Sequence, residues 1–219
     1  MANDRVSTHG RPLDRLLVST ANRVIRPRDL SPYYTNPRDE AARLVERGDL
    51  RKLATGYFLV VPDDRRATDW RPPIEDLALA LAVADYGEDA VALMGPSAAR
   101  VLGLLPRALA GAVVAVPKQR PPLATAFGRL EFVTRDIRRL DWQRYAGVLC
   151  EGYTTTVEQT ALDIASRPGL GGLTPAAAEE LLSTLAAHAD LTLVDDLAAR
   201  QRRRPAAARV RAAKDAGGE

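Results

Sequence analysis

A charged, proline-rich stretch near residue 68 divides this sequence into two parts with regular apolar patterns. Residues 62–73 have the sequence PDDRRATDWRPP, with three prolines and six charged side chains. Proline removes a backbone donor, and such polar, proline-rich stretches are typical of connections between domains. The 219 residues are 46% apolar and 27% charged, which is typical of globular proteins. We therefore predict two domains, residues 1–68 with the linker and residues 69–219.

The first domain is expected to begin with two helical segments. From Pro12 to Val24, leucines and valines recur at the spacing of a helix face, and proline suits a first helical turn. An Arg-Pro-Arg sequence at residues 26–28 ends this pattern, because proline disfavours the helical conformation of the residue before it. A short segment, Asp29–Tyr34, is expected to follow.

A better marked helix comes next, followed by two strands. Asn36 suits the N-cap, Pro37 suits the first helical position, and Gly48 suits the C-terminal end. Two short segments, Leu-Arg-Lys-Leu and Tyr-Phe-Leu-Val-Val, then surround an Ala-Thr-Gly turn, which predicts strands at Leu50–Leu53 and Tyr57–Val61. The order helix, short helix, capped helix, hairpin is that of a winged helix-turn-helix.

The second domain is predicted to have an α+β fold. Helices are expected at Ile74–Tyr86, Ser97–Leu104, Val157–Ser166, Pro175–Ala187, Leu193–Arg203 and Ala206–Lys214. Strands are expected at Ala112–Val116, Leu130–Thr134 and Gly147–Cys150, with a loop at Pro117–Ala126. Because the strands are grouped between helices at both ends, this pattern favours α+β over a doubly wound sheet.

Several kinds of protein are excluded by what the sequence lacks. The longest apolar run, Leu77–Ala84, is too short to span a bilayer, and no hydrophobic signal core follows the first residues. One cysteine, Cys150, makes neither an internal disulfide nor a thiolate-rich metal site. We expect a cytoplasmic protein without a metal or cofactor.

The small net charge of +3 conceals an uneven distribution. Residues 1–68 carry 13 Lys+Arg against 9 Asp+Glu, residues 69–199 carry 11 against 17, and residues 200–219 carry 7 against 2. Two basic ends around an acidic middle predict that any contact with nucleic acid is confined to part of the chain.

The capped helix and the hairpin carry the candidate DNA-binding residues. In a winged helix-turn-helix, the second helix of the motif enters the major groove and the hairpin lies along the DNA backbone. Arginine forks match guanine edges and phosphates, and basic or aromatic residues just before the helix are common phosphate anchors. The candidates are Arg28, Tyr34, Arg38, Arg43, Arg51 and Lys52.

Other interpretations of these features stay open. The basic side chains are also compatible with the solvated surface of a winged helix that binds protein. The basic tail, Arg200–Arg211, is either a further phosphate contact, a patch for an acidic partner or a solvated helix face. Catalysis finds little support, because His9 and His188 are isolated and the glycines of residues 169–172 suit a helix end better than a phosphate loop.

The order of these motifs resembles the AbiEi-like antitoxins of type IV toxin–antitoxin systems, a family linked to abortive phage infection. Ala41–Val61 is similar to the family's N-terminal winged helix, and Leu93–Leu105 to the small-residue helix at the start of its C-terminal domain. Val113–Pro117 followed by Gly128–Thr134 is similar to the family's central strands. Gly152–Pro168 is similar to its Thr-x-Glu-x-Thr-Leu-x-Asp helix, here with Glu158, Thr160, Leu162 and Asp163. The resemblance covers roughly residues 15–200.

This resemblance implies a non-enzymatic antitoxin that represses its own promoter through inverted repeats. It also implies a cognate nucleotidyltransferase toxin as the partner, with antitoxicity assigned to the second domain. The family's DNA contacts carry over to Arg38, Arg43, Arg51 and Lys52, and less directly to Arg28 and Tyr34.

Two other function classes are weighed against the antitoxin. A ligand-responsive winged-helix transcriptional regulator would need an apolar pocket with a few polar groups in the second domain. A nuclease would need a cluster of carboxylates and lysine, and Lys118 is the one lysine between residues 53 and 213.

Overall fold

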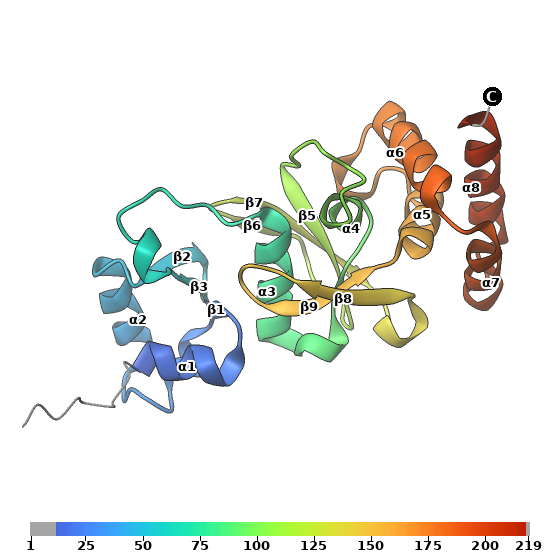
Figure 1. The fold of residues 1–219 in the computed structure, drawn as a ribbon. Helices are drawn as coiled ribbons and strands as arrows, with labels where there is room; N and C mark the ends of the chain where they lie inside the picture. Colours follow the sequence, from blue (N-terminus) through green and yellow to red (C-terminus); the bar gives the residue numbers. More distant parts are fainter. Residues whose placement is uncertain (1–11, 218–219) are drawn as a thin grey trace, which may run out of the picture. The chain divides into compact units, whose positions relative to one another are not determined.

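A computed structural model describes residues 12–217, so His9 lies outside the described residues. The chain divides into two compact units, Met1–Trp70 and Arg71–Glu219. The boundary falls inside the stretch predicted to be a linker. The fold is mixed α+β, and each unit has its own sheet (Figure 1).

The first unit combines two helices with a three-stranded antiparallel sheet of order β1-β3-β2. Its elements are α1 (Pro12–Thr20), β1 (Val24–Ile25), the 3-10 helix η1 (Pro27–Leu30), α2 (Pro37–Glu46), β2 (Leu50–Ala54), β3 (Tyr57–Val60) and the 3-10 helix η2 (Asp63–Arg65). The helix and hairpin expected between residues 36 and 61 are confirmed.

The expectation that the first helix continues to Val24 is wrong. The helix ends at Thr20, whose hydroxyl donates to the Leu16 carbonyl, and Ala21 has a positive φ of 48°. The side chain of Asn22 then accepts from the Val24 amide, which turns the chain into β1. Val24 and its neighbour are buried against β3, so tertiary pairing overrides the helical spacing.

The core of the first unit lies between the two helices and the sheet. It consists of buried aliphatic residues from α1, β1, η1, α2, β2 and β3: Leu13, Leu16, Ile25, Leu30, Ala41, Leu44, Leu50 and Val60. The segment expected as a helix at Asp29–Tyr34 is instead η1, which ends at Leu30.

The second unit is built on a six-stranded mixed sheet of order β6-β7-β5-β4-β9-β8. Its strands are β4 (Ala92–Leu93), β5 (Gly111–Val116), β6 (Leu123–Thr125), β7 (Gly128–Thr134), β8 (Trp142–Ala146) and β9 (Glu151–Thr155). Its helices are α3 (Ile74–Tyr86), α4 (Pro96–Val101), α5 (Val157–Ser166), α6 (Pro175–His188), α7 (Leu191–Gln201) and α8 (Arg204–Gly217). Three short 3-10 helices complete the described part of this unit, η3 (Glu88–Ala90), η4 (Ile137–Arg139) and η5 (Leu170–Gly172).

Pairings in this sheet alternate between the two directions. β7 pairs parallel with β5 and β4 pairs parallel with β9, whereas the other neighbours are antiparallel. The four C-terminal helices gather beyond one side of the sheet, where α6 and α5 both pack against α8 (Figure 1). Their leucines and alanines form a separate apolar cluster with α5 at its centre.

Two sequence predictions for this unit are wrong. The strand expected at Gly147–Cys150 is the turn between β8 and β9, and Leu149 and Cys150 are buried as turn residues. The turn is held by Asp76 on α3, which accepts from the Val148 amide at 3.0 Å and from the Tyr145 hydroxyl at 2.5 Å. The loop expected at Pro117–Ala126 contains β6.

Within residues 12–217, no helix combines the length and the apolar character that crossing a membrane requires.

Candidate nucleic-acid interface

A groove of about 800 Å³ lies in the first unit between η1, the start of α2 and the β2–β3 hairpin. We call it the basic groove, because four of its lining residues are basic and one is acidic. The basic residues are Arg26, Arg28, Arg38 and Lys52, and the acidic residue is Asp39. Three of the six predicted DNA-binding residues, Arg28, Arg38 and Lys52, therefore meet in one place.

The first turn of α2 contributes its backbone to this groove. Asn36, Pro37 and Arg38 all line it, and the helix starts at Pro37. The first amides of a helix have no intrahelical acceptor, and the Asn36 side chain makes no cap hydrogen bond. Free amides and the positive end of the helix dipole both favour an anion at this point.

The segment before α2 holds two arginines at the edge of the groove. Asp29 accepts from the Arg26 amide at 2.8 Å and lies 3.6 Å from the Arg28 guanidinium. The Arg26 guanidinium lies 5.3 Å from the centre of the Tyr57 ring, within the range of a cation–π contact. Arg28 keeps 59% of its side chain exposed, so its guanidinium is accessible to a ligand.

The hairpin brings in Lys52 from β2. Lys52 pairs with Phe58 in the register of the two strands, and its side chain is exposed. The turn depends on Gly56, whose φ of 81° is a conformation that other residues rarely adopt. Thr55 and Gly56 also line the groove, so the tip of the hairpin forms one of its walls.

The other three predicted residues lie elsewhere. Arg43 is exposed on α2, where it forms an ion pair with Glu40 at 3.5 Å. The Arg51 guanidinium donates to the Trp70 carbonyl at 2.7 Å, a contact that fixes the chain after η2. Tyr34 lines a different groove.

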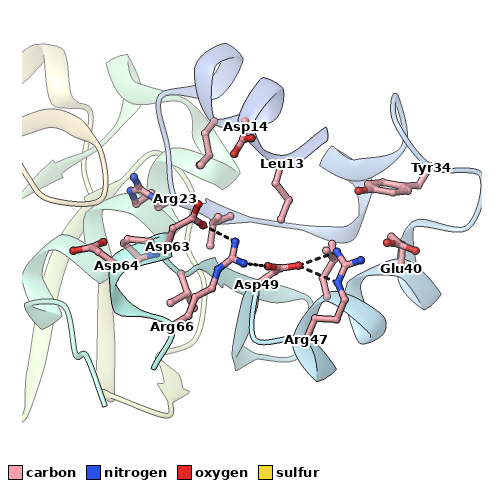
Figure 2. Close-up of a pocket in the computed structure, with 15 residues that line it drawn as sticks. Leu13, Asp14, Arg23, Tyr34, Glu40, Arg47, Asp49, Asp63, Asp64 and Arg66 are labelled. Carbon is pink, nitrogen blue, oxygen red and sulfur yellow. Dashed lines mark hydrogen bonds and ion pairs between the residues drawn. The ribbon is translucent and has the colours of Figure 1, made fainter. Parts of the chain in front are cut away.

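That second groove, of about 890 Å³, is shown in Figure 2. We call it the acidic groove, since five of its charged lining residues are acidic and three are basic. The acidic residues are Asp14, Glu40, Asp49, Asp63 and Asp64, and the basic residues are Arg23, Arg47 and Arg66. Burial, and next the charge of Glu40, raise the pKa of the Tyr34 hydroxyl. An excess of carboxylates repels phosphate, which makes this groove a poor site for nucleic acid.

Asp49 is the centre of an ion-pair network in the acidic groove (Figure 2). Its buried carboxylate lies 2.8 Å from the Arg47 guanidinium and 2.7 Å from that of Arg66. Arg66 also contacts Asp63 at 2.5 Å. The network ties the beginning of the predicted linker to the start of β2, so this stretch is part of the first unit.

Sequence reasoning placed Arg26 near the helix but did not identify its position in the groove. Its position is determined by β1, because Arg26 follows directly after this strand and β1 pairs with β3. A pair of β-branched residues, Val24 and Ile25, ahead of the Arg-Pro sequence is the feature that could have indicated it.

Comparison with known proteins identifies a similar fold. No protein-family model matches this sequence, and no curated protein matches it. Among solved structures, the chain is similar to the crystal structure of the RV2827C protein from Mycobacterium tuberculosis, with 22% sequence identity and a TM-score of 0.61. The alignment covers 100% of this chain and 80% of that chain. At this level of identity the likeness concerns the fold alone.

Proposed function

We propose that the first unit is a winged helix-turn-helix domain that binds DNA through the basic groove. The observation that carries this proposal is the convergence of Arg28, Arg38 and Lys52 beside the first turn of α2. In this proposal α2 is the recognition helix and the β2–β3 hairpin is the wing. The three-stranded antiparallel sheet closed by β1 is the support that such a hairpin requires.

Within the basic groove, Arg38 and Lys52 suit different contacts with DNA. Arg38 lies at the start of α2, where a recognition helix contacts base edges. Lys52 on the hairpin suits a phosphate, because a lysine acts as a point charge on a flexible stem. The acidic groove, with its excess of carboxylates, is not part of the proposed DNA contact.

For the whole chain, we propose an AbiEi-like antitoxin of a type IV toxin–antitoxin system. It would bind inverted repeats in its own promoter as a repressor and counteract a nucleotidyltransferase toxin encoded beside it. The support is the resemblance in Gly152–Pro168, where three of the polar residues have defined contacts. Thr160 bonds to Thr155 at 2.8 Å, Glu158 accepts from the Asp190 amide, and Asp163 pairs with Arg203.

The DNA-binding proposal is tested by gel-shift titration of the full chain with its promoter DNA. Arg38→Ala is expected to weaken binding by about 1–3 kcal/mol and to relax specificity if Arg38 contacts a base. Arg65→Ala is the matched control, since this exposed arginine pairs with Asp64 outside the basic groove. Equal binding by both variants and the parent would exclude the groove as the DNA contact.

The antitoxin proposal is tested by co-expression with the product of the neighbouring gene. A full chain carrying Arg38→Ala and Lys52→Ala is expected to lose repression and still restore growth. Restored growth without DNA binding would assign antitoxicity to a surface outside the basic groove. Loss of both properties would mean that protection acts through repression, and failure of the parent to protect would exclude the antitoxin.

A further inference from the structure

Five arginines from two distant segments of the sequence line one pocket of the second unit. The pocket has a volume of about 440 Å³ and lies where the end of β7 and η4 meet the turn between α7 and α8. We call it the arginine pocket. Its arginines are Arg135, Arg139, Arg200, Arg202 and Arg203, and one carboxylate, Asp136, also lines it.

Contacts with buried polar residues fix the two sides of this pocket. The Gln201 side-chain amide donates to the Arg139 carbonyl at 3.1 Å and to the Gln159 side chain at 2.5 Å. Next to it, Arg203 donates to Asp163 at 2.7 Å. The α7–α8 turn is therefore anchored to both η4 and α5, and these contacts fix the shape of the pocket.

Most of the positive charge in the pocket is uncompensated. Asp136 is engaged by Arg138, which donates to both of its oxygens at 3.0 and 3.2 Å from outside the pocket. Within residues 12–217, the guanidinium groups of Arg139, Arg200 and Arg202 have no hydrogen bond or ion pair. Like charges held together in this way favour a bound anion.

Arg135 supplies an independent indication of an anion site. Its Nε atom is buried and has no hydrogen-bond partner among the described residues, while one of its Nη atoms donates to the Thr134 carbonyl. Burial, and next the charge of Arg203, lower the pKa of Arg135. A buried donor without an acceptor is costly, and an anion oxygen in the pocket would provide one.

The backbone of the turn is also unusual at this point. Arg202 adopts the left-handed conformation with φ 58° and ψ 41°, a position where helices commonly end on glycine. An arginine there pays a conformational cost, and it lines the pocket. The turn thus presents a charged side chain at a site where the backbone alone would favour glycine.

We propose that the arginine pocket binds a small oligophosphate, a molecule with two or more linked phosphate groups. Guanidinium forks match phosphate oxygens in pairs, and several free arginines require an anion of more than one charge. The source could be a free compound or a nucleic-acid backbone. The free compound is favoured because residues 71–219 carry 18 Lys+Arg and 18 Asp+Glu, so the second unit has no net positive charge to attract a nucleic acid. This site is separate from the basic groove.

The test is calorimetric titration of the full chain with inorganic triphosphate. Arg139→Gln and Arg202→Gln are each expected to weaken binding about tenfold or more, because each removes charge-assisted hydrogen bonds. Arg204→Gln is the matched control, since this neighbouring exposed arginine does not line the pocket. Arg139→Lys, which keeps the charge, is expected to retain part of the affinity, and unchanged circular dichroism confirms that each variant is folded.

Three results would overturn the proposal. The first is the absence of triphosphate binding by the parent chain at millimolar concentration. The second is an equal loss of binding in Arg204→Gln, or a loss caused by Arg38→Gln in the basic groove and not by the pocket variants. The third is tighter binding of a short single-stranded oligonucleotide than of triphosphate, with the same sensitivity to Arg139→Gln, which would assign the pocket to a nucleic-acid backbone.

Discussion

The guanidinium of Arg203 donates to the carboxylate of Asp163 at 2.7 Å, and this pair joins α5 to the turn between α7 and α8. Asp163 is 2% exposed, so its charge depends on Arg203 for compensation. Removing one partner of a buried ion pair leaves the other charge buried alone. The pair is therefore a buried polar link between α5 and the α7–α8 turn, beside the apolar cluster of the C-terminal helices.

We expect Arg203→Ala to lower the free energy of unfolding by about 3–5 kcal/mol, as measured by urea denaturation. The control is Arg211→Ala, which breaks the pair with Asp195 between half-exposed side chains. That change is expected to cost about 1 kcal/mol or less. Equal losses in the two variants would contradict a special role of the buried pair.

The two adjacent basic residues of β2 are expected to behave differently in DNA binding. Lys52→Ala should weaken binding to all sequences and reduce the slope of log affinity against log salt by roughly one unit. Arg51→Ala should instead reduce the stability of the first unit, because Arg51 is bonded to the Trp70 carbonyl. Salt titrations and thermal unfolding of both variants distinguish these effects, and a changed salt slope in Arg51→Ala would assign this residue to the DNA.

Loss of the Asp49 network should release the segment that follows β3. Asp49→Asn removes the charge that holds Arg47 and Arg66, so trypsin is expected to cut after Arg65 or Arg66 several times faster. Asp64→Asn is the control, because Asp64 is 72% exposed and, among the described residues, pairs with Arg65 alone. Unchanged cleavage in Asp49→Asn would show that other contacts hold this segment.

Cys150 should be unreactive in the folded protein at pH 8. Burial, and next the charge of Asp76, raise the pKa of its thiol to about 12, against about 8.5 in an unfolded chain. Only the thiolate reacts with iodoacetamide, so labelling is expected in urea and not in buffer. Rapid labelling of the native chain would contradict this burial.

The same shift has a consequence for stability. Between about pH 8.5 and about pH 12 the unfolded thiol loses its proton while the folded thiol keeps it, so stability falls as the pH rises. The contribution is fully present below about pH 8.5. Cys150→Ala is expected to show a smaller fall in urea stability between pH 8 and pH 10 than the parent.

Elements with clear end signals could be predicted from the sequence. Ile74–Tyr86 lies between Pro73 and Gly87, and its predicted bounds agree with those of α3. Val157–Ser166 likewise agrees with α5, whose N-cap Thr156 accepts from the Gln159 amide. In both cases the residues that determine the helix are local, so no knowledge of distant contacts was needed.

Elements that depend on distant partners could not be predicted. β8 is largely exposed and has no apolar alternation, so its sequence does not indicate a strand. The turn at 147–150 is apolar and resembles a strand in sequence, but its conformation depends on the contact with Asp76, which is distant in the chain. The same reasoning applies to the sites. Arg38 and Lys52 could be identified as candidate DNA contacts from the order of the motifs. The proximity of Arg139 to Arg202 depends on the packing of the α7–α8 turn and could not be predicted in this way.

The position of β4 has a consequence for the order in which the second unit assembles during synthesis. Leu93 pairs with Val114 on one side and with Thr154 on the other, so this two-residue strand joins the β5–β7 half of the sheet to the β8–β9 hairpin. Until the ribosome has released β9, one edge of β4 has no partner strand. A nascent chain of this protein therefore exposes an apolar sheet edge for the time needed to synthesise residues 94–155, which is when it is most open to aggregation or capture by a chaperone.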